Sequence, residues 1–427
     1  MTKRATIWLA LLLVGAGGAS ASPEEASAPL FDRIDRTLDL SGTVRLDYFR
    51  STKSLDEETD LLGLTAQLKA LPTFTSHLDG KLEARFSSPP LGDGGSVHTR
   101  LLEGYLTWHS SKLELRIGRQ IVAWGRADGI NPTDNLTPRD YVALLPFEDD
   151  QRFGTTAAKV DVFASRDHTV SLFASPFFTP HRVPTPPSAR GFGRALPTRT
   201  FANTELGIRL NKVGEAVDWS LSYYRGFNLL PGLVLLPQTG SPLVQARYAR
   251  IRVYGADFAR NYGRFGFRGE VAYVDTNDRL GNDPTTINPS LFFVLGVDRT
   301  FLANLNVNLQ YFRRQVRGYS SWEAIADLGE RTLAFQNALI AGQRDHVSDG
   351  VTFRIGNKWL HDTLEAEIFG IVNFTTKDSF ARPQVTYLIS DHWKASFGFD
   401  WIRGANDTPF GSQKANRGAF VETRYSF

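Results

Sequence analysis

The stretch Leu305-Asn306-Val307-Asn308-Leu309-Gln310-Tyr311 decides the fold class, because its apolar and polar residues alternate strictly. Such alternation predicts a β-strand with one apolar and one polar face. A soluble sandwich buries the apolar face between two sheets. A membrane barrel instead turns the apolar face towards lipid and the polar face towards a wet lumen. Alternation by itself is compatible with both.

Three further features favour the membrane barrel. Many alternating segments are about ten residues long, the length that a tilted strand needs to cross a bilayer. Aromatic residues close the apolar face at both ends, as Trp393 and Trp401 do for one segment, and this is the pattern of interfacial girdles. The polar face is often charged, as in 81–86, where Lys, Glu and Arg alternate with Leu, Ala and Phe. A closed barrel also satisfies every backbone group within hydrocarbon.

The chain is therefore predicted to be all-β, a single transmembrane antiparallel β-barrel of about 18 strands. Sixteen strands remain an alternative, because the segments 168–176 and 383–390 are short. Short and long connectors alternate along the chain, which predicts short periplasmic turns and long extracellular loops. The expected strands are 39–50, 60–71, 77–87, 98–109, 112–119, 154–164, 168–176, 202–211, 217–227, 249–258, 263–275, 288–298, 302–313, 349–358, 361–372, 383–390, 393–402 and 417–427.

The two ends of the chain indicate a route to the outer membrane. Residues 1–21 combine a basic start, a short apolar run and an Ala-Ser-Ala site, which predicts a secretory signal peptide. We expect residues 22–38 to form a short periplasmic segment and residues 39–427 to form the barrel. The last strand ends on Tyr425 and Phe427, and this terminal aromatic pattern resembles the signal by which barrel-assembly machinery recognises its substrates for insertion among outer-membrane lipids.

Composition excludes several classes of function. The chain has 427 residues and no cysteine, which removes disulfides, iron–sulfur clusters and covalently attached haem. With 48 basic and 45 acidic residues it lacks the basic excess of a nucleic-acid binder. Asp-His pairs such as Asp345-His346 have no identifiable third partner, so we expect no enzyme. We also expect no cofactor and no metal.

The polar faces of the predicted strands would line the lumen. Their charges have two interpretations: cross-strand ion pairs that stiffen a wet wall, or an arginine-lined path that favours anionic solutes. Both can hold together. The predicted pore-lining residues are Arg45, Arg85, Arg116, Arg209, Arg250, Arg252, Arg264, Arg268, Arg354, Arg424, Glu83, Glu114 and Glu270.

The connector 119–153 is the most distinctive part of the chain. It has more than 30 residues without clear periodicity, and loops of that kind are uncommon unless they are functional. We predict that it folds into the lumen as a constriction, and a packed surface loop is the alternative. The predicted constriction residues are Trp124, Arg126, Asp128, Asn131, Asp134, Arg139 and Asp140.

A second connector, 314–348, should contain a helix. Ser320-Ser321-Trp322-Glu323 has the spacing of a capping box, and apolar residues follow it at helical intervals. We expect this helix to lie over the mouth of the barrel.

The run Gly118-Arg119-Gln120, followed by Trp124-Gly125-Arg126, resembles a motif in alginate-export-type outer-membrane barrels and in a related porin-like family of uncharacterised function. The close similarity covers this segment, and the looser similarity covers the whole architecture. The resemblance implies an 18-stranded barrel. In the alginate exporters an anionic polysaccharide passes through an arginine-lined lumen.

Three functional hypotheses follow. The first is a porin-like channel through which hydrophilic, anionic solutes diffuse. The second is an export channel for an anionic polysaccharide, which needs a periplasmic partner. The third is a barrel that sheathes a partner protein such as a cytochrome.

Overall fold

The computed structural model describes residues 38–52, 59–88, 97–142, 151–183, 193–236, 243–302 and 304–427. The predicted signal peptide, 1–21, and all but the last residue of the predicted periplasmic segment, 22–38, lie outside the described residues.

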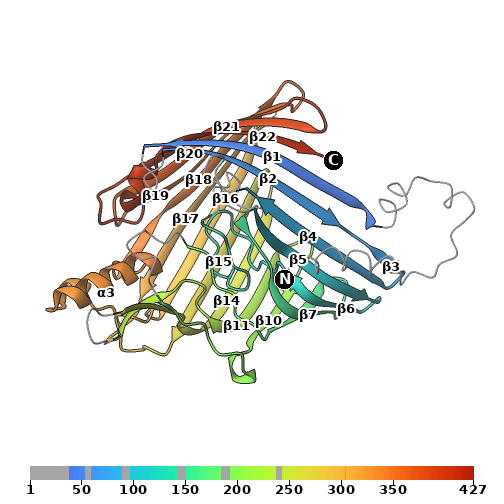
Figure 1. Cartoon of the computed structure of the whole chain (residues 1–427). Coiled ribbons are helices and arrows are strands. Elements are labelled where there is room, and N and C mark those ends of the chain that lie inside the picture. The colour runs from blue at the N-terminus through green and yellow to red at the C-terminus, as the bar shows by residue number, and fades with distance from the viewer. Residues whose placement is uncertain are drawn as a thin grey trace, which may run out of the picture.

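Eighteen antiparallel strands close into one barrel (Figure 1). Each strand pairs with the next along the chain, and the last strand pairs with the first to close the ring. The strands are β1 (Leu40–Ser51), β2 (Asp60–Ala70), β4 (Leu78–Ser87), β5 (His98–His109), β6 (Leu113–Gln120), β7 (Thr155–Phe163), β8 (His168–Ser175), β10 (Glu205–Lys212), β11 (Asp218–Phe227), β14 (Arg250–Tyr262), β15 (Phe265–Thr276), β16 (Ser290–Phe301), β17 (Leu305–Val316), β18 (Val347–Trp359), β19 (Leu364–Asn373), β20 (Asp378–Leu388), β21 (Trp393–Arg403) and β22 (Gly418–Ser426). The prediction of 18 strands is confirmed, and the alternative of 16 is wrong.

The two faces of the wall are chemically opposite. On β1, Leu46 points outward and is 47% exposed, while its neighbour Arg45 points inward and is 1% exposed. The register with β2 keeps this separation, because Leu46 pairs with Leu64 and Arg45 pairs with Thr65. A shift of one residue would reverse every side chain, so this alternation fixes the register. None of the helices in the described part of the chain is long and apolar enough to cross a membrane.

The connectors differ strongly between the two ends of the barrel. At one end, which we call the short-turn end, neighbouring strands are joined by brief turns such as 164–167, 263–264 and 360–363. The chain ends there as well, where Phe427 exchanges two backbone hydrogen bonds of 3.0 Å with Gly42 at the start of β1. Tyr425 stacks on this terminal ring with 6.2 Å between the ring centroids. The other end, the long-loop end, carries the connector 121–154 among others.

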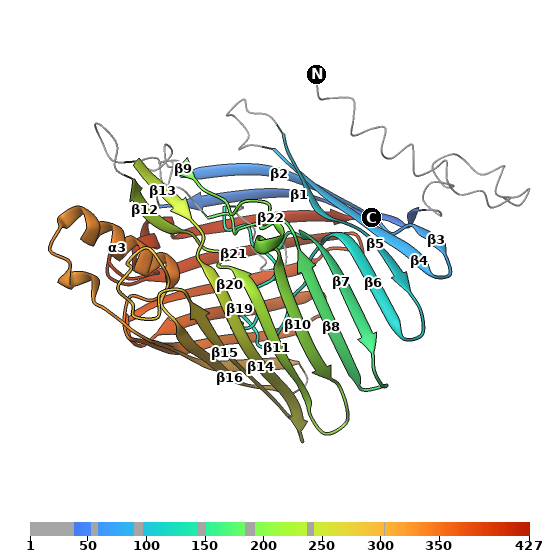
Figure 2. The same ribbon diagram turned by 90° about the horizontal axis from the view of Figure 1, so that it is seen from below.

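The long-loop end contains structure of its own. The predicted helix in 314–348 exists as α3 (Leu328–Ala341). Its cap is not the expected one, because Ser321 caps the short 3₁₀ turn η5 (Trp322–Ala324) and Asp327 caps α3 with a 2.8 Å bond from the Glu330 N–H. Figure 2 also shows a small sheet that the sequence did not reveal, formed by β9 (Gly193–Arg194), β12 (Gly232–Leu236) and β13 (Leu243–Arg247). The three-residue strand β3 (Thr73–Thr75) pairs with β4 at the short-turn end.

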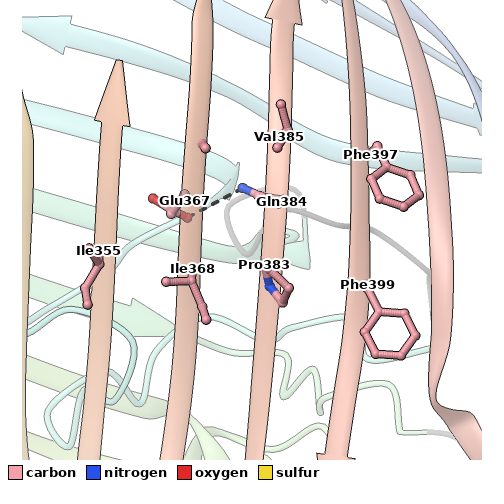
Figure 3. Close-up of a pocket in the computed structure, with 9 residues that line it drawn as sticks. Ile355, Glu367, Ile368, Pro383, Gln384, Val385, Phe397 and Phe399 are labelled. Atoms are coloured by element: carbon pink, nitrogen blue, oxygen red, sulfur yellow. Dashed lines mark hydrogen bonds between the residues drawn. The ribbon is translucent and has the colours of Figure 1, made fainter. Parts of the chain in front are cut away.

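Strand β20 begins earlier than expected and runs through a proline. The prediction placed a strand at 383–390 after a long loop, but β20 starts at Asp378 and the connector before it has four residues. Pro383 has no N–H to give, and the pairing with β21 skips it. A shallow groove of about 320 Å³ opens there on the outer wall, lined by apolar side chains such as Ile368 and Phe399 (Figure 3). Beside this groove, the side-chain amide of Gln384 donates a hydrogen bond to the carboxylate of Glu367.

Candidate functional site

The interior of the barrel holds the connector between β6 and β7, and its described parts are 121–142 and 151–154. Gln120 ends β6 fully buried, with its side-chain amide donating to the Ala157 carbonyl at 2.9 Å. The loop then closes on itself through Thr137, whose hydroxyl accepts from the Val122 N–H at 2.8 Å and donates to the Val122 carbonyl at 2.6 Å. These bonds direct the chain inward instead of out over the rim.

An apolar contact holds the first part of the loop against the wall. Trp124 is 3% exposed and packs with Val122 and Leu136 against inward residues of the strands β7 to β15, including Phe173 and Ile251. Gly207 on β10 leaves the space for the indole, because a Cβ atom there would lie 2.7 Å from the ring. The inner wall is therefore apolar where Trp124 packs against it, which is the reverse of a wet lumen.

Glu270 on β15 anchors the middle of the loop. Its carboxylate is 3% exposed and accepts hydrogen bonds from the backbone N–H groups of Arg126 and Ala127, and from the Thr133 hydroxyl at 3.1 Å. A buried carboxylate needs such donors to offset its lost hydration. The loop supplies them all from residues 126–133.

Arg126 carries the second polar anchor. Its guanidinium forms an ion pair with Asp257 on β14 and donates to the side-chain oxygen of Asn211 on β10 at 2.7 Å. Asp257 also accepts from Arg209 at 3.2 Å and from Ser220. One buried carboxylate thus joins the loop to the wall, with two arginines to balance it.

Asp128 extends the loop to the far wall. Its carboxylate lies 3.1 Å from Nε of Arg354 on β18 and 3.3 Å from the amide of Asn308 on β17. Strand β18 is the ninth after β6 in a ring of eighteen, so the loop reaches the wall opposite the strand that it leaves. Figure 1 shows this segment inside the barrel.

The returning part of the loop docks onto the next long loop, 176–204. Asp134 pairs with Arg152 at 2.7 Å and with Arg139 at 3.4 Å. Asp140 pairs with Arg182 at 2.6 Å, and Nδ1 of His181 accepts from the Arg139 N–H at 2.8 Å.

His181 sits among cations without carrying a charge. Burial, followed by the nearby charges of Arg139 and Arg152, lowers the pKa of His181 to about 3. The ring is therefore neutral at ordinary pH, which is what Nδ1 needs to accept the Arg139 hydrogen bond.

The wall on the other side of the lumen is charged and partly exposed. Its inward side chains form ion pairs along and across the strands. Arg382 and Asp400 form a two-pronged pair at 2.5 and 2.7 Å, and Arg354 reaches Glu367 at 2.8 Å. A recess of about 220 Å³ lies between Arg354, Gln384 and Lys394. The interior therefore divides into a loop-covered half and an ionised half, from β18 through β22 and β1 to β6.

Most of the predicted pore-lining side chains face this interior, because they alternate with exposed apolar residues of the same strand. The inward-facing ones are Arg45, Arg85, Arg116, Arg209, Arg268, Arg354, Arg424, Glu83, Glu114 and Glu270. Asn131 of the loop donates to the Trp124 carbonyl at 2.8 Å. The structure thus brings the predicted loop residues together inside the barrel, and whether they restrict a flow of solute stays a proposal.

Three predicted lumen residues are corrected. Arg252 shares its face with the exposed outward ring of Tyr254 and pairs with Asp275 at 3.2 Å. Arg250 lies on the same outward parity, stacked 4.9 Å from the ring of Phe227. Arg264 belongs to the turn between β14 and β15. At this end of β14 the inward side chains Ile251 and Val253 pack against the loop, so the apolar parity faces inward and charge does not identify the inner face there.

Asp257 is the residue that the sequence analysis missed. It alternates with Ala256 and Phe258 on a predicted strand, so the same period-two argument places it inward. Asn308 lies on the polar face of the alternating stretch 305–311, so that argument places it inward as well. Asn211 carried no such signal, because an amide at a strand end is common.

Comparisons with known proteins identify the fold. No protein-family model and no curated protein sequence matches the chain. Among solved structures, the outer membrane protein OpdK of Pseudomonas aeruginosa matches with a TM-score of 0.57 and 10% identity over 91% of this chain and 98% of that one. OccAB4 of Acinetobacter baumannii matches with a TM-score of 0.54 and 9% identity over 91% and 97%. OccD3 (OpdP) of Pseudomonas aeruginosa matches with a TM-score of 0.51 and 12% identity over 91% and 90%. The chain therefore has the fold of outer-membrane porins.

Proposed function

We propose that this chain is a porin-like channel of the outer membrane, in which small hydrophilic solutes diffuse along the ionised half of the lumen. One observation carries the proposal: the loop 121–142 is fixed across the barrel by Glu270, Asp257 and Arg354, and it covers the inner wall from β7 to β15. The charged half, with side chains such as Arg116 and Glu114 about one quarter exposed, is left to water.

We further propose that the channel prefers anions. Guanidinium groups bind carboxylates through two parallel hydrogen bonds, and Arg382 displays that geometry towards Asp400. A passing carboxylate can compete for such donors. The preference should be modest, since Arg382, Arg354 and Arg116 each already face an acidic neighbour. OpdK, one of the similar structures, is also known with vanillate, an aromatic carboxylate, which makes vanillate a suitable probe.

Diffusion of small solutes fits the loop better than the other two hypotheses. Export of a polysaccharide and enclosure of a partner protein each need a wide lumen. Here the loop bridges to the opposite wall, and releasing Glu270 from its four donors would leave its buried charge unsatisfied.

Planar-bilayer recording of the refolded full-length barrel tests the proposal. We expect discrete conductance steps, and in a KCl gradient a reversal potential with the sign of anion preference. Vanillate should block or carry current, whereas the uncharged vanillyl alcohol should not. Folding of the protein is verified by its heat-modifiable electrophoretic mobility. If the folded protein gives no conductance steps, the proposal of a channel is overturned. A reversal potential with the sign of cation preference would overturn the selectivity alone.

A further inference from the structure

A group of arginines and aromatic rings lies on the outer wall at the short-turn end of β14, β15 and β16, three strands that Figure 2 shows side by side. Arg260 pairs across the ladder with Phe267, and Phe265 pairs with Arg299. Arg264 sits in the turn between β14 and β15. We call Arg260, Arg264 and Arg299, with Phe265, Phe267 and Phe301, the basic–aromatic patch.

The patch faces outward, away from the lumen. Arg260 has the parity of Phe258, and Arg299 has the parity of Leu295, which is 53% exposed. The three rings of the patch are each between 37% and 41% exposed. Adjacent strands lie about 4.8 Å apart, so Arg260 and Arg299, two strands apart, are within joint reach of one group of atoms.

Arg299 is held in a fixed position. Its guanidinium lies 4.7 Å from the ring centroid of Phe265 and 4.5 Å from that of Phe301. Its Nε atom is buried and has no hydrogen-bond partner within the described residues. The two rings therefore orient a cation whose terminal N–H groups remain to be used.

The patch lacks the carboxylates that balance comparable arginines elsewhere. At the long-loop end, three of the outward-facing arginines lie against acidic groups: Arg50 against Asp60 at 3.8 Å, Arg252 against Asp275 at 3.2 Å and Arg313 against Asp349 at 4.0 Å. Within the part of the chain that the structure describes, Arg260, Arg264 and Arg299 form no ion pair. Because these three cations lie at the edge of an apolar band without a carboxylate of this chain to balance them, we expect an anion from outside the chain to bind there.

We propose that the basic–aromatic patch binds the phosphodiester headgroup of a phospholipid in the leaflet at the short-turn end. The phosphate oxygens accept from the arginines, which bind phosphate in a forked geometry. The exposed rings of Phe265, Phe267 and Phe301 contact the glycerol and the first methylenes of the acyl chains. Free phosphate satisfies the charge but leaves these rings without a partner, so the surface fits a lipid.

Native mass spectrometry of the full barrel, released from detergent micelles, tests this site. The probes are phosphatidylglycerol, a diacylglycerol with the same acyl chains but no phosphate, and inorganic phosphate. The triple variant Arg260→Gln, Arg264→Gln, Arg299→Gln is compared with a matched control, Arg50→Gln, Arg252→Gln, Arg313→Gln, which removes the same charge at the long-loop end. Arg299→Lys keeps the charge but loses the stacking between the two rings.

We expect the patch variant to retain about tenfold less phosphatidylglycerol, the loss typical of one charge-assisted contact, while the control retains as much as the wild type. Arg299→Lys should give an intermediate loss, and it serves as the readout if the triple variant does not fold. Equal retention by the two triple variants overturns the proposal. Retention of diacylglycerol or inorganic phosphate equal to that of phosphatidylglycerol also overturns it.

Discussion

The carboxylate of Asp128 lies 3.1 Å from Nε of Arg354, and this pair fastens the tip of an internal loop to the wall opposite its origin. Arg354 holds Glu367 at the same time, at 2.8 Å. The contact is about one third exposed on both sides, so water reaches it. It marks the boundary between the loop-covered half of the lumen and the ionised half.

Replacing Asp128 by Asn should loosen the loop tip without unfolding the barrel. The variant keeps the shape of the side chain but removes the charge, and a partly exposed ion pair contributes only about 0.5–1 kcal/mol. We expect a small rise in single-channel conductance and more open-channel noise. Asp362→Asn, in an exposed short turn, is the matched control. Identical noise in both variants would show that the tip does not border the conducting path.

Glu270→Ala should have a much larger effect than Asp128→Asn. It removes the acceptor of three backbone N–H groups and one hydroxyl inside the wall, and each buried donor left unpaired costs about 1–3 kcal/mol. We expect the loop to leave the wall, a clear rise in conductance, and a lower temperature of the mobility shift on electrophoresis. Glu365→Ala, at a partly exposed lumen position, should change neither by much. Equal effects of the two variants would contradict the anchoring role of Glu270.

The strands could be predicted from the sequence because their signal is local. Alternation places Leu46 outward and Arg45 inward from neighbouring residues alone, and the structure agrees. The start of β20 escaped the prediction because Pro383 is typical of a strand boundary, whereas a closed ladder tolerates it at the cost of two skipped pairings.

The contacts of the loop could not be predicted in the same way. That Arg126 would meet Asp257, or Asp128 would meet Arg354, depends on how far around the ring the loop extends, and no local pattern encodes that. Composition and length did predict an internal loop, because its charged and aromatic residues show no strand or helix periodicity. Arg252 failed for the opposite reason: it lies on a regular strand, but the loop packs on the apolar parity of that strand end and so turns the charged parity outward.

Acidification should loosen the contact between the two long loops. The pKa of His181 is lowered to about 3 in the folded protein, against an ordinary value of 6.5, so between these values the unfolded state binds more protons. The stabilising contribution is therefore complete above pH 6.5, declines as the pH falls, and is lost below about 3. Protonation removes the acceptor for the Arg139 N–H and adds a cation beside Arg139 and Arg152.

Hydrogen exchange measures this effect. We expect exchange at the Arg139 amide to gain protection between pH 4 and pH 7 in the wild type, after correction for the intrinsic rate. His181→Gln keeps an acceptor that does not titrate, so its corrected protection should be flat over the same range. A wild-type profile as flat as that of the variant would rule out His181 as the titrating group.

Arg382 and Asp400 should set ion selectivity in opposite directions. Their two-pronged pair lies on the ionised half of the lumen, and both side chains are about one fifth exposed. Asp400→Asn leaves the guanidinium with one fewer carboxylate, so the reversal potential in a KCl gradient should move towards anion preference. Arg382→Gln leaves Asp400 without that cation and should move it towards cation preference. The double variant should return close to the wild type, because the pair is neutral as a unit.

Arg299→Gln, on the outer wall, is the charge-matched control and should leave the reversal potential unchanged, since its field is screened from the lumen by the barrel wall and salt. Shifts of the same sign in both single variants would place the conducting path elsewhere in the barrel.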